Sequence, residues 1–167
     1  PKLASMSSSP YYVGSLKKPK NLRSLLKDHL PNPLFSLLKE VGSLAEQNRV
    51  SVYAVGGFIR DLLLEIPNFD VDLVVEGNGI TFARCLAQER EARLKVHKRF
   101  GTATLMLPDG CKLDIATART EHYDFPAALP RVEQSSIKKD LFRRDFTIIT
   151  LAIRLNSSHF GNLIDFY

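Results

Sequence analysis

The sequence has no tryptophan and only two cysteines, Cys85 and Cys111, which are far apart and lack the spacing of metal ligands. Two such cysteines predict buried thiols of a reducing compartment and argue against a disulfide or a zinc site, so we expect a cytoplasmic protein. No apolar run approaches the roughly 18 residues that a membrane span requires. The N-terminus also lacks the positive-then-apolar pattern of a secretory signal, so we expect no membrane partner.

Charge is present but unevenly distributed. The net charge of the 167 residues is +5, and residues 1–50 hold eight Lys/Arg against three acids, whereas residues 51–167 hold fifteen of each. The opening stretch SMSSSPYYVGSLKKPK is rich in Ser, Pro and Lys and has no periodicity, which is typical of a linker. The alternative is that its KKPK cluster touches RNA phosphates. We predict a flexible basic tail over 1–31 and one domain over 32–167. The neutral balance of residues 51–167 argues against a dedicated RNA-binding module.

Hydrophobic periodicity predicts helices and strands in alternation from residue 32 onward. Asn32 is the expected N-cap of the first helix and Pro33 its first residue. A glycine pair, Gly56-Gly57, ends the first strand, and Pro67 stops the second helix. The predicted elements are a helix over 33–47, a strand over 50–55, a helix over 58–65, a strand over 69–76, and a helix over 79–92 that closes on the basic RLKVHKR.

The second half of the sequence predicts a hairpin and a long helix. Two alternating runs over 102–117 are joined by Pro108-Asp109-Gly110, which is turn chemistry. Residues 120–136 read as irregular, and 135–155 as a helix capped by Ser135 or Ser136. This order predicts an α/β (α+β) fold, a small mixed β-sheet flanked by helices.

Two carboxylates, Asp70 and Asp72, stand at the start of the strand FDVDLVVE. The two-residue period of a strand puts them on one face, where they repel, and each desolvated charge costs several kcal/mol unless it is compensated. A divalent metal is the natural compensation, and Mg²⁺ binds through one or two carboxylates plus substrate phosphates. The alternative, a strand edge that faces solvent, is the commoner explanation of a lone D-x-D.

The neighbourhood of these acids favours the metal. Gly56 and Gly57 open a helix with bare backbone N–H groups, which suit a phosphate, and Arg60 lies on the first turn of that helix. Asp114, in CKLDIAT, faces away from its apolar neighbours and is free to join the other two acids. Three carboxylates, a phosphate cradle and an arginine are typical of metal-assisted nucleotidyl transfer.

Three segments together resemble a known family: VYAVGGFIRDLLLEIPNFDVDLVVEG, HKRFGTATLMLPDGCKLDIATARTEHY and KKDLFRRDF. They resemble the head domain of the bacterial tRNA nucleotidyltransferase / poly(A) polymerase family, which adds CCA, C or A to tRNA 3′ ends or polyadenylates RNA. The resemblance implies a template-independent nucleotidyltransferase head with ATP and/or CTP, a tRNA or other RNA 3′ end, and Mg²⁺. A nucleotide-binding fragment without turnover and a poly(A) polymerase acting on general RNA are the alternatives.

The resemblance also implies roles for individual residues. Asp70 and Asp72 look like the metal-binding pair, and Asp114 resembles the third catalytic acid, which deprotonates the RNA 3′-hydroxyl. Gly57 and Arg60 match positions that contact the incoming nucleotide.

Further positions of the family motifs lie in the C-terminal half. Arg144 and Asp145 match the pair that reads the ribose, and Arg119 supplies positive charge near the phosphates. The loop over 122–134 resembles the one that helps the family switch nucleotides. Ile149 stands where the family has Asn, a departure from the ribose-reading motif. Family members continue past the equivalent of residue 167 into neck, body and tail domains, so we expect this chain to be a catalytic head.

Overall fold

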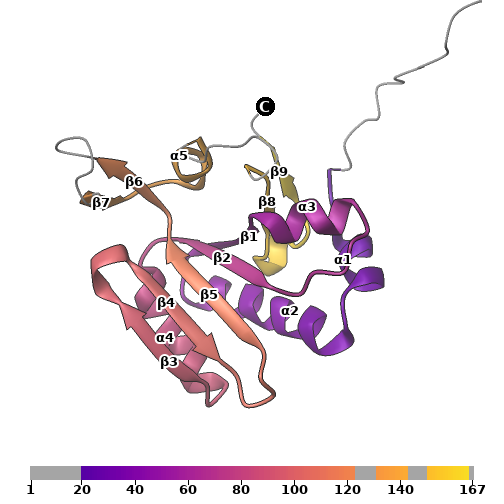
Figure 1. Ribbon diagram of the computed structural model, residues 1–167, viewed down its shortest axis with the longest axis horizontal. Helices are drawn as coiled ribbons and strands as arrows, with labels where there is room; N and C mark the ends of the chain where they lie inside the picture. Colours follow the sequence, from indigo (N-terminus) through magenta and orange to yellow (C-terminus); the bar gives the residue numbers. More distant parts are fainter. Residues whose placement is uncertain (1–19, 123–130, 143–149, 166–167) are drawn as a thin grey trace, which may run out of the picture.

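The computed structural model describes residues 20–122, 131–142 and 150–165 (Figure 1). Within them, seven strands form one sheet in the order β3-β4-β5-β2-β1-β8-β9. β2 and β5 pair in parallel and the other neighbours are antiparallel, so the predicted mixed sheet is confirmed. The strands are β1 (Ser51–Val55), β2 (Val71–Glu76), β3 (Arg93–His97), β4 (Thr102–Met106), β5 (Lys112–Thr117), β8 (Ala152–Arg154) and β9 (Leu163–Ile164).

Helices cover one face of this sheet. α2 (Asn32–Gln47) packs behind β1, and α4 (Gly79–Glu89) packs behind β3, β4 and β5 (Figure 1). The alternate side chains of each strand that point to these helices form the main core. Burial of each such Val, Leu or Ile contributes about 1.5–3 kcal/mol. The buried strand residues of this core are Val52, Ala54, Val71, Leu73, Val75, Ala103, Leu105, Leu113, Ile115 and Ile153.

The other face of the sheet is covered over only part of its width. The short helix α5 (Ile137–Phe142) packs Ile137 and Leu141 onto Tyr53, Val55 and Val74. Within the described residues, no helix covers β3, β4 and β5 on this side (Figure 1). We call this side of the strands β2, β3, β4 and β5 the open face.

The N-terminal boundary differs from the prediction. α1 (Arg23–His29) forms within the segment predicted as a tail, and Leu22, Leu26 and Leu30 are buried in the main core. Residues 20–22 also bond to the C-terminal part, where the Leu22 N–H donates to the Gly161 carbonyl at 2.7 Å. Residues 20–31 therefore belong to the packed domain, whereas residues 1–19 lie outside the described residues.

Helix starts were predicted with mixed success. Asn32 is the first residue of α2 and not its N-cap, because the Pro31 carbonyl already accepts the Phe35 N–H at 3.0 Å. The alternative Ser136 cap of α5 is confirmed by its hydroxyl, which accepts the Lys139 N–H at 3.4 Å.

Five strands were not predicted. β3 replaces the basic end expected for a helix, and β6 (Arg119–His122) and β7 (Arg131–Gln134) pair in a segment expected to be irregular. β8 replaces the end of the helix predicted over 135–155, and β9 lies beyond the last predicted element. In β8, Ala152 and Ile153 are both buried, one on each side of the sheet. A strand buried on both sides loses its alternation, so its pattern cannot be told from that of a buried helix. In the described part of the chain no helix is long and apolar enough to cross a bilayer.

Candidate active site

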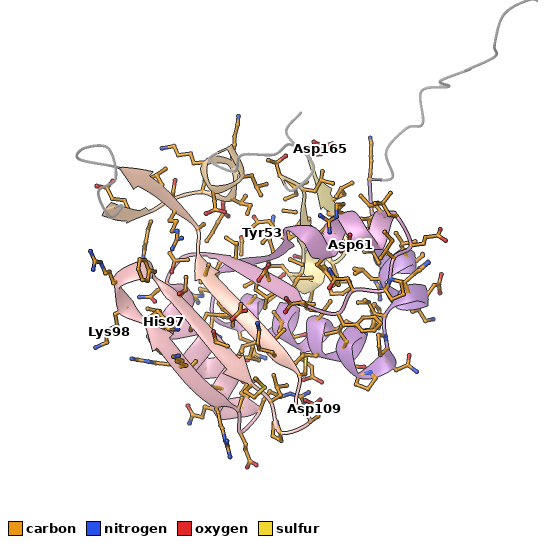
Figure 2. The ribbon with its side chains drawn as sticks, viewed as in Figure 1. Tyr53, Asp61, His97, Lys98, Asp109 and Asp165 are labelled. Atoms are coloured by element: carbon orange, nitrogen blue, oxygen red, sulfur yellow. The ribbon has the colours of Figure 1, made fainter. Side chains whose placement is uncertain are left out.

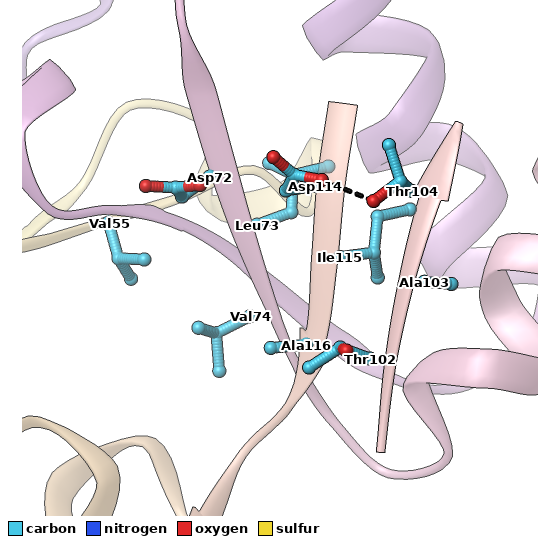
Figure 3. A pocket seen from close by; sticks show the side chains of 10 residues that line it. All are labelled: Val55, Asp72, Leu73, Val74, Thr102, Ala103, Thr104, Asp114, Ile115 and Ala116. Carbon is cyan, nitrogen blue, oxygen red and sulfur yellow. Dashed lines mark hydrogen bonds between the residues drawn. The ribbon is translucent and has the colours of Figure 1, made fainter. Parts of the chain in front are cut away.

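Two predicted acids meet on the open face. Asp72 of β2 lies directly opposite Asp114 of β5 in the parallel register, and both side chains are on the side away from the main core (Figure 3). The apolar neighbours of Asp114, Leu113 and Ile115, are buried on the other side, as predicted. The two aspartates line one cavity of about 290 Å³ together with Thr104 and other residues of β1, β2, β4 and β5. Adjacent strands lie about 4.8 Å apart, so the two negative charges are close enough to repel.

Two further side chains hold Asp114. The Thr104 hydroxyl donates to Asp114 Oδ1 at 2.6 Å, and the Lys112 ammonium lies 2.8 Å from Oδ2. Partial burial by itself would raise the pKa of Asp114, but the bonds from Lys112 and Thr104 outweigh it and leave that pKa below its usual value. Asp114 is therefore ionised at neutral pH.

Sequence reasoning missed both partners, although each leaves a signal. Lys112 stands two residues before Asp114, so strand alternation puts it on the same face. Thr104 lies opposite Asp114 once the turn at Pro108-Asp109-Gly110 sets the hairpin register.

Asp70 lies beside this pair rather than within it. It is exposed just before β2, and its Oδ1 is 3.8 Å from the Lys112 ammonium, which therefore sits between Asp70 and Asp114. Among the described residues, no three Asp, Glu, His or Cys side chains are grouped closely enough to hold a metal ion. The structure thus brings Asp72 and Asp114 together, and the role of Asp70 as a metal ligand stays a prediction.

A buried carboxylate links Arg60 to the segment that carries Asp70. In α3 (Gly57–Leu63), Arg60 donates through Nε and Nη2 to the two carboxylate oxygens of Asp61, at 2.7 and 2.9 Å. Asn68 donates to Asp61 Oδ2 at 2.7 Å, and its own Oδ1 accepts the backbone N–H of Asp70 at 3.0 Å. The bonds from Arg60 and then from Asn68 lower the pKa of Asp61. One carboxylate therefore orients the predicted phosphate-binding arginine and the loop before β2, a role not foreseen from the sequence.

The glycine pair lies next to Asp72, because Val55 pairs with Asp72 and the chain then turns into α3. Gly56 has φ 80° and ψ −150°, a conformation that only glycine adopts readily. Gly57 is helical, and a Cβ there would meet the Arg60 guanidinium at 3.5 Å, an ordinary contact. The fold thus requires glycine at 56 but not at 57, which is consistent with close approach of a ligand at Gly57.

Other predicted residues lie elsewhere. Arg119 stands past the far end of β5 from Asp114, where its backbone N–H donates to Asp140 at 3.2 Å and its Nη1 donates to the Phe100 carbonyl. Arg144, Asp145 and Ile149 lie outside the described residues, as does most of the loop predicted over 122–134.

A mixed sheet with paired carboxylates beside a glycine turn is the arrangement expected of a nucleotidyltransferase-type head domain. The chain belongs to the poly(A) polymerase head domain family, whose model matches residues 52–167. This match confirms the resemblance noted from the sequence motifs.

Individual proteins that are similar in sequence or in structure support the same family. An A-adding tRNA nucleotidyltransferase of Geobacter sulfurreducens is 49% identical over 160 residues, covering 94% of this chain and 18% of that protein. The apo form II of a CCA-adding enzyme is similar with a TM-score of 0.83 and 48% identity, over 88% of this chain and 35% of that one. The Thermotoga maritima CCA-adding enzyme complexed with tRNA has a TM-score of 0.77 and 41% identity, over 88% and 32%. This chain therefore spans about a third or less of the relatives it matches.

Proposed function

We propose that this chain is the catalytic head of a template-independent RNA nucleotidyltransferase. It transfers AMP or CMP from ATP or CTP to the 3′ end of a tRNA and releases pyrophosphate. The observation that carries the proposal is the pairing of Asp72 with Asp114 on the open face, beside the glycine turn that begins α3. The names of the A-adding, CC-adding and CCA-adding relatives support tRNA over general RNA as the acceptor.

The donor groups present fit a divalent metal. Carboxylate oxygens are the ligands that Mg²⁺ prefers, and it keeps several positions for water and substrate phosphates, so two or three aspartates are sufficient. We propose that Asp70 and Asp72 hold Mg²⁺ when nucleotide is bound. A metal bound there supplies charge neutralisation for the triphosphate and the attacking oxygen.

Other residues of the site bind the triphosphate, the RNA 3′-hydroxyl and the ribose. The backbone N–H groups at Gly56 and Gly57 and the guanidinium of Arg60 bind the triphosphate, in line with the phosphate preference of such turns. Ionised Asp114, oriented by Thr104, accepts a hydrogen bond and then the proton from the RNA 3′-hydroxyl. Arg144 and Asp145 bind the ribose.

The alternative function is a nucleotide-binding head without turnover of its own. The test incubates the chain with ATP, Mg²⁺ and a tRNA that lacks its terminal adenosine, and follows pyrophosphate release and tRNA length. Asp72→Asn is the inactive control.

Each outcome decides between these functions. Extension of the tRNA by one nucleotide supports the catalytic head. Mg²⁺-dependent ATP binding without extension supports the nucleotide-binding head. Absence of Mg²⁺-dependent ATP binding refutes both.

A further inference from the structure

The edge strand of the open face carries a row of basic side chains. Leu94 and Val96 of β3 pack on the main core, so Arg93, Lys95 and His97 point to the open side. Alternate residues of a strand are about 6.6 Å apart, which makes a stripe of positive charge along the edge of the sheet. Figure 2 shows His97 and the following Lys98 at this edge.

This stripe lies on the same face as the paired aspartates. Across the sheet, Asp72 pairs with Asp114, Asp114 with Thr104, and Thr104 with Lys95. Lys95 is thus in one row with the two carboxylates, about 10 Å from Asp114 at the usual strand spacing. His97 is close enough for its charged form to lower the pKa of Asp114, after the larger effects of burial, Lys112 and Thr104.

The turn after β3 extends the stripe and adds an aromatic ring. In the 3₁₀ helix η1 (Lys98–Phe100), Lys98 and Arg99 are exposed, and Phe100 is 39% exposed although it is a large apolar side chain. Arg119 donates to the Phe100 carbonyl and so ties this turn to the strand after β5. We define the basic edge as Arg93, Lys95, His97, Lys98, Arg99 and Phe100.

The charges of the basic edge are not balanced locally. Its segment contains no acid, and the nearest one before it along the chain, Glu91, precedes β3. In the described parts of the chain, none of its four Lys and Arg side chains forms an ion pair with a carboxylate. By contrast, Arg90 at the end of α4 pairs with Glu40 at 3.2 Å. The basic edge therefore has positive charge available for an external anion.

We propose that the basic edge binds the last nucleotides of a single-stranded RNA and leads its 3′ end along the Lys95 row to Asp114. The inference rests on the proposed function and adds the surface on which the acceptor lies. Lys and Arg side chains bind phosphates of any sequence. An exposed aromatic ring among them stacks on a base, the combination found in proteins that bind single strands.

A different role for the same residues is protection of the sheet. Charged side chains on an edge strand prevent the strand from pairing with another molecule. This role explains the charges of β3 but not the exposed ring of Phe100. The two roles predict different results when the charges are removed.

The test measures binding of a fluorescently labelled 12-nucleotide single-stranded RNA with a free 3′-hydroxyl, by anisotropy at several salt concentrations. The edge variant is Arg93→Gln/Lys95→Gln/Arg99→Gln. The control variant, Lys27→Gln/Lys39→Gln/Arg49→Gln, removes the same charge from exposed residues of α1, α2 and the turn after α2. Phe100→Ala is compared with Phe100→Tyr, which keeps an aromatic ring.

The edge variant is expected to bind the RNA at least tenfold more weakly at low salt, and to lower the slope of log K against log salt by about 2. Phe100→Ala is expected to weaken binding by about fivefold or more, whereas Phe100→Tyr retains it. The control variant is expected to stay within about threefold of the parent. All variants keep the melting temperature and the Mg²⁺-dependent ATP affinity of the parent, because the changed side chains are exposed and remote from the glycine turn.

Three results overturn the inference: equal losses in the edge and control variants, no measurable RNA binding by the parent, or self-association of the edge variant with RNA affinity unchanged. Failure of the proposed function is a separate observation, since the parent then shows no Mg²⁺-dependent ATP binding.

Discussion

The two faces of the sheet are built from alternate residues of the same strands and differ in almost every property. On β5, Leu113 and Ile115 are buried against the helices, whereas Lys112 and Asp114 lie on the open face with their charges paired to each other. Burial on the covered face contributes stability, and the open face carries the polar groups of the candidate site. Substitutions one residue apart should therefore have opposite consequences for stability and for ligand binding.

The largest effect on stability is expected from a substitution in the core of the covered face. Leu113→Ala, at a side chain with no exposed surface, should lower the free energy of unfolding by about 2–5 kcal/mol. Its neighbour Asp114→Asn should change that free energy by less than about 1 kcal/mol, because the side chain is partly exposed and its ion pair is weak. Urea denaturation of both variants measures the difference. Equal destabilisation would contradict the separation of the two faces.

The adjacent glycines Gly56 and Gly57 allow stability and ligand binding to be separated in the backbone as well. Gly56→Ala should cost about 1–3 kcal/mol of stability, since its φ and ψ are almost confined to glycine. Gly57→Ala should fold with stability unchanged or raised by up to about 1 kcal/mol, because the added Cβ finds an ordinary contact in a helix. The same variant should bind Mg·ATP at least tenfold more weakly, as measured by calorimetry. Full ATP affinity in Gly57→Ala would show that the phosphates do not approach this residue.

The link from Asp61 to Asp70 predicts an effect on metal dependence. Asn68→Ala should remove the bond to the Asp70 N–H, loosen the loop before β2 and raise the Mg²⁺ concentration needed for half-maximal ATP binding about three- to tenfold. Asn78→Ala is the matched control, because Asn78 also accepts a backbone N–H, that of Thr81 at 2.9 Å, but at the start of α4. Both variants should lose about 1 kcal/mol of stability. An equal shift in Mg²⁺ requirement for the two would refute a specific role of Asn68.

The smallest effect concerns pH and the Lys112–Asp114 pair. The pKa of Asp114 is lowered in the folded state, so the ionised carboxylate stabilises the fold above its usual pKa, and this stability is lost as the pH falls through the lowered value. The pKa of Lys112 is raised by the hydrogen bond to Asp114, so its contribution is lost only in strongly alkaline solution. Lys112→Met should thus lower the melting temperature slightly at neutral pH and leave it unchanged at a pH below the usual carboxylate range. If Lys112→Met still melts at a lower temperature than the parent in acid, the loss of stability is due to packing and not to the ion pair.

The open face could be read from the sequence because strand alternation is local. The apolar neighbours of Asp114 predicted its direction, and two alternating runs around Pro108-Asp109-Gly110 predicted the hairpin. The same alternation was present in Arg93–His97 but was read as the end of a helix. Lys112 and Thr104 could have been found by applying strand alternation and hairpin register one step further.

Contacts between distant parts of the chain could not be read in this way. Residues 20–31 were assigned to a tail because nothing near them in sequence shows that Leu22 bonds to Gly161. β8 was read as helix because Ala152 and Ile153 are both buried, which leaves no alternation. The bonds of Asp61 to Asn68 depend on how the chain turns after α3, which composition does not reveal.

The pairing of residues 20–22 with the C-terminal strand region has a consequence for connectivity. Asn21 bridges to Asn162, and the Leu163 N–H donates to the Lys20 carbonyl at 3.0 Å, so the first and last described segments lie side by side. The chain therefore enters and leaves the domain at adjacent points. A circular permutant that joins these ends by a short glycine linker and opens the chain at the exposed Pro108–Gly110 turn should keep every strand pairing and both faces of the sheet.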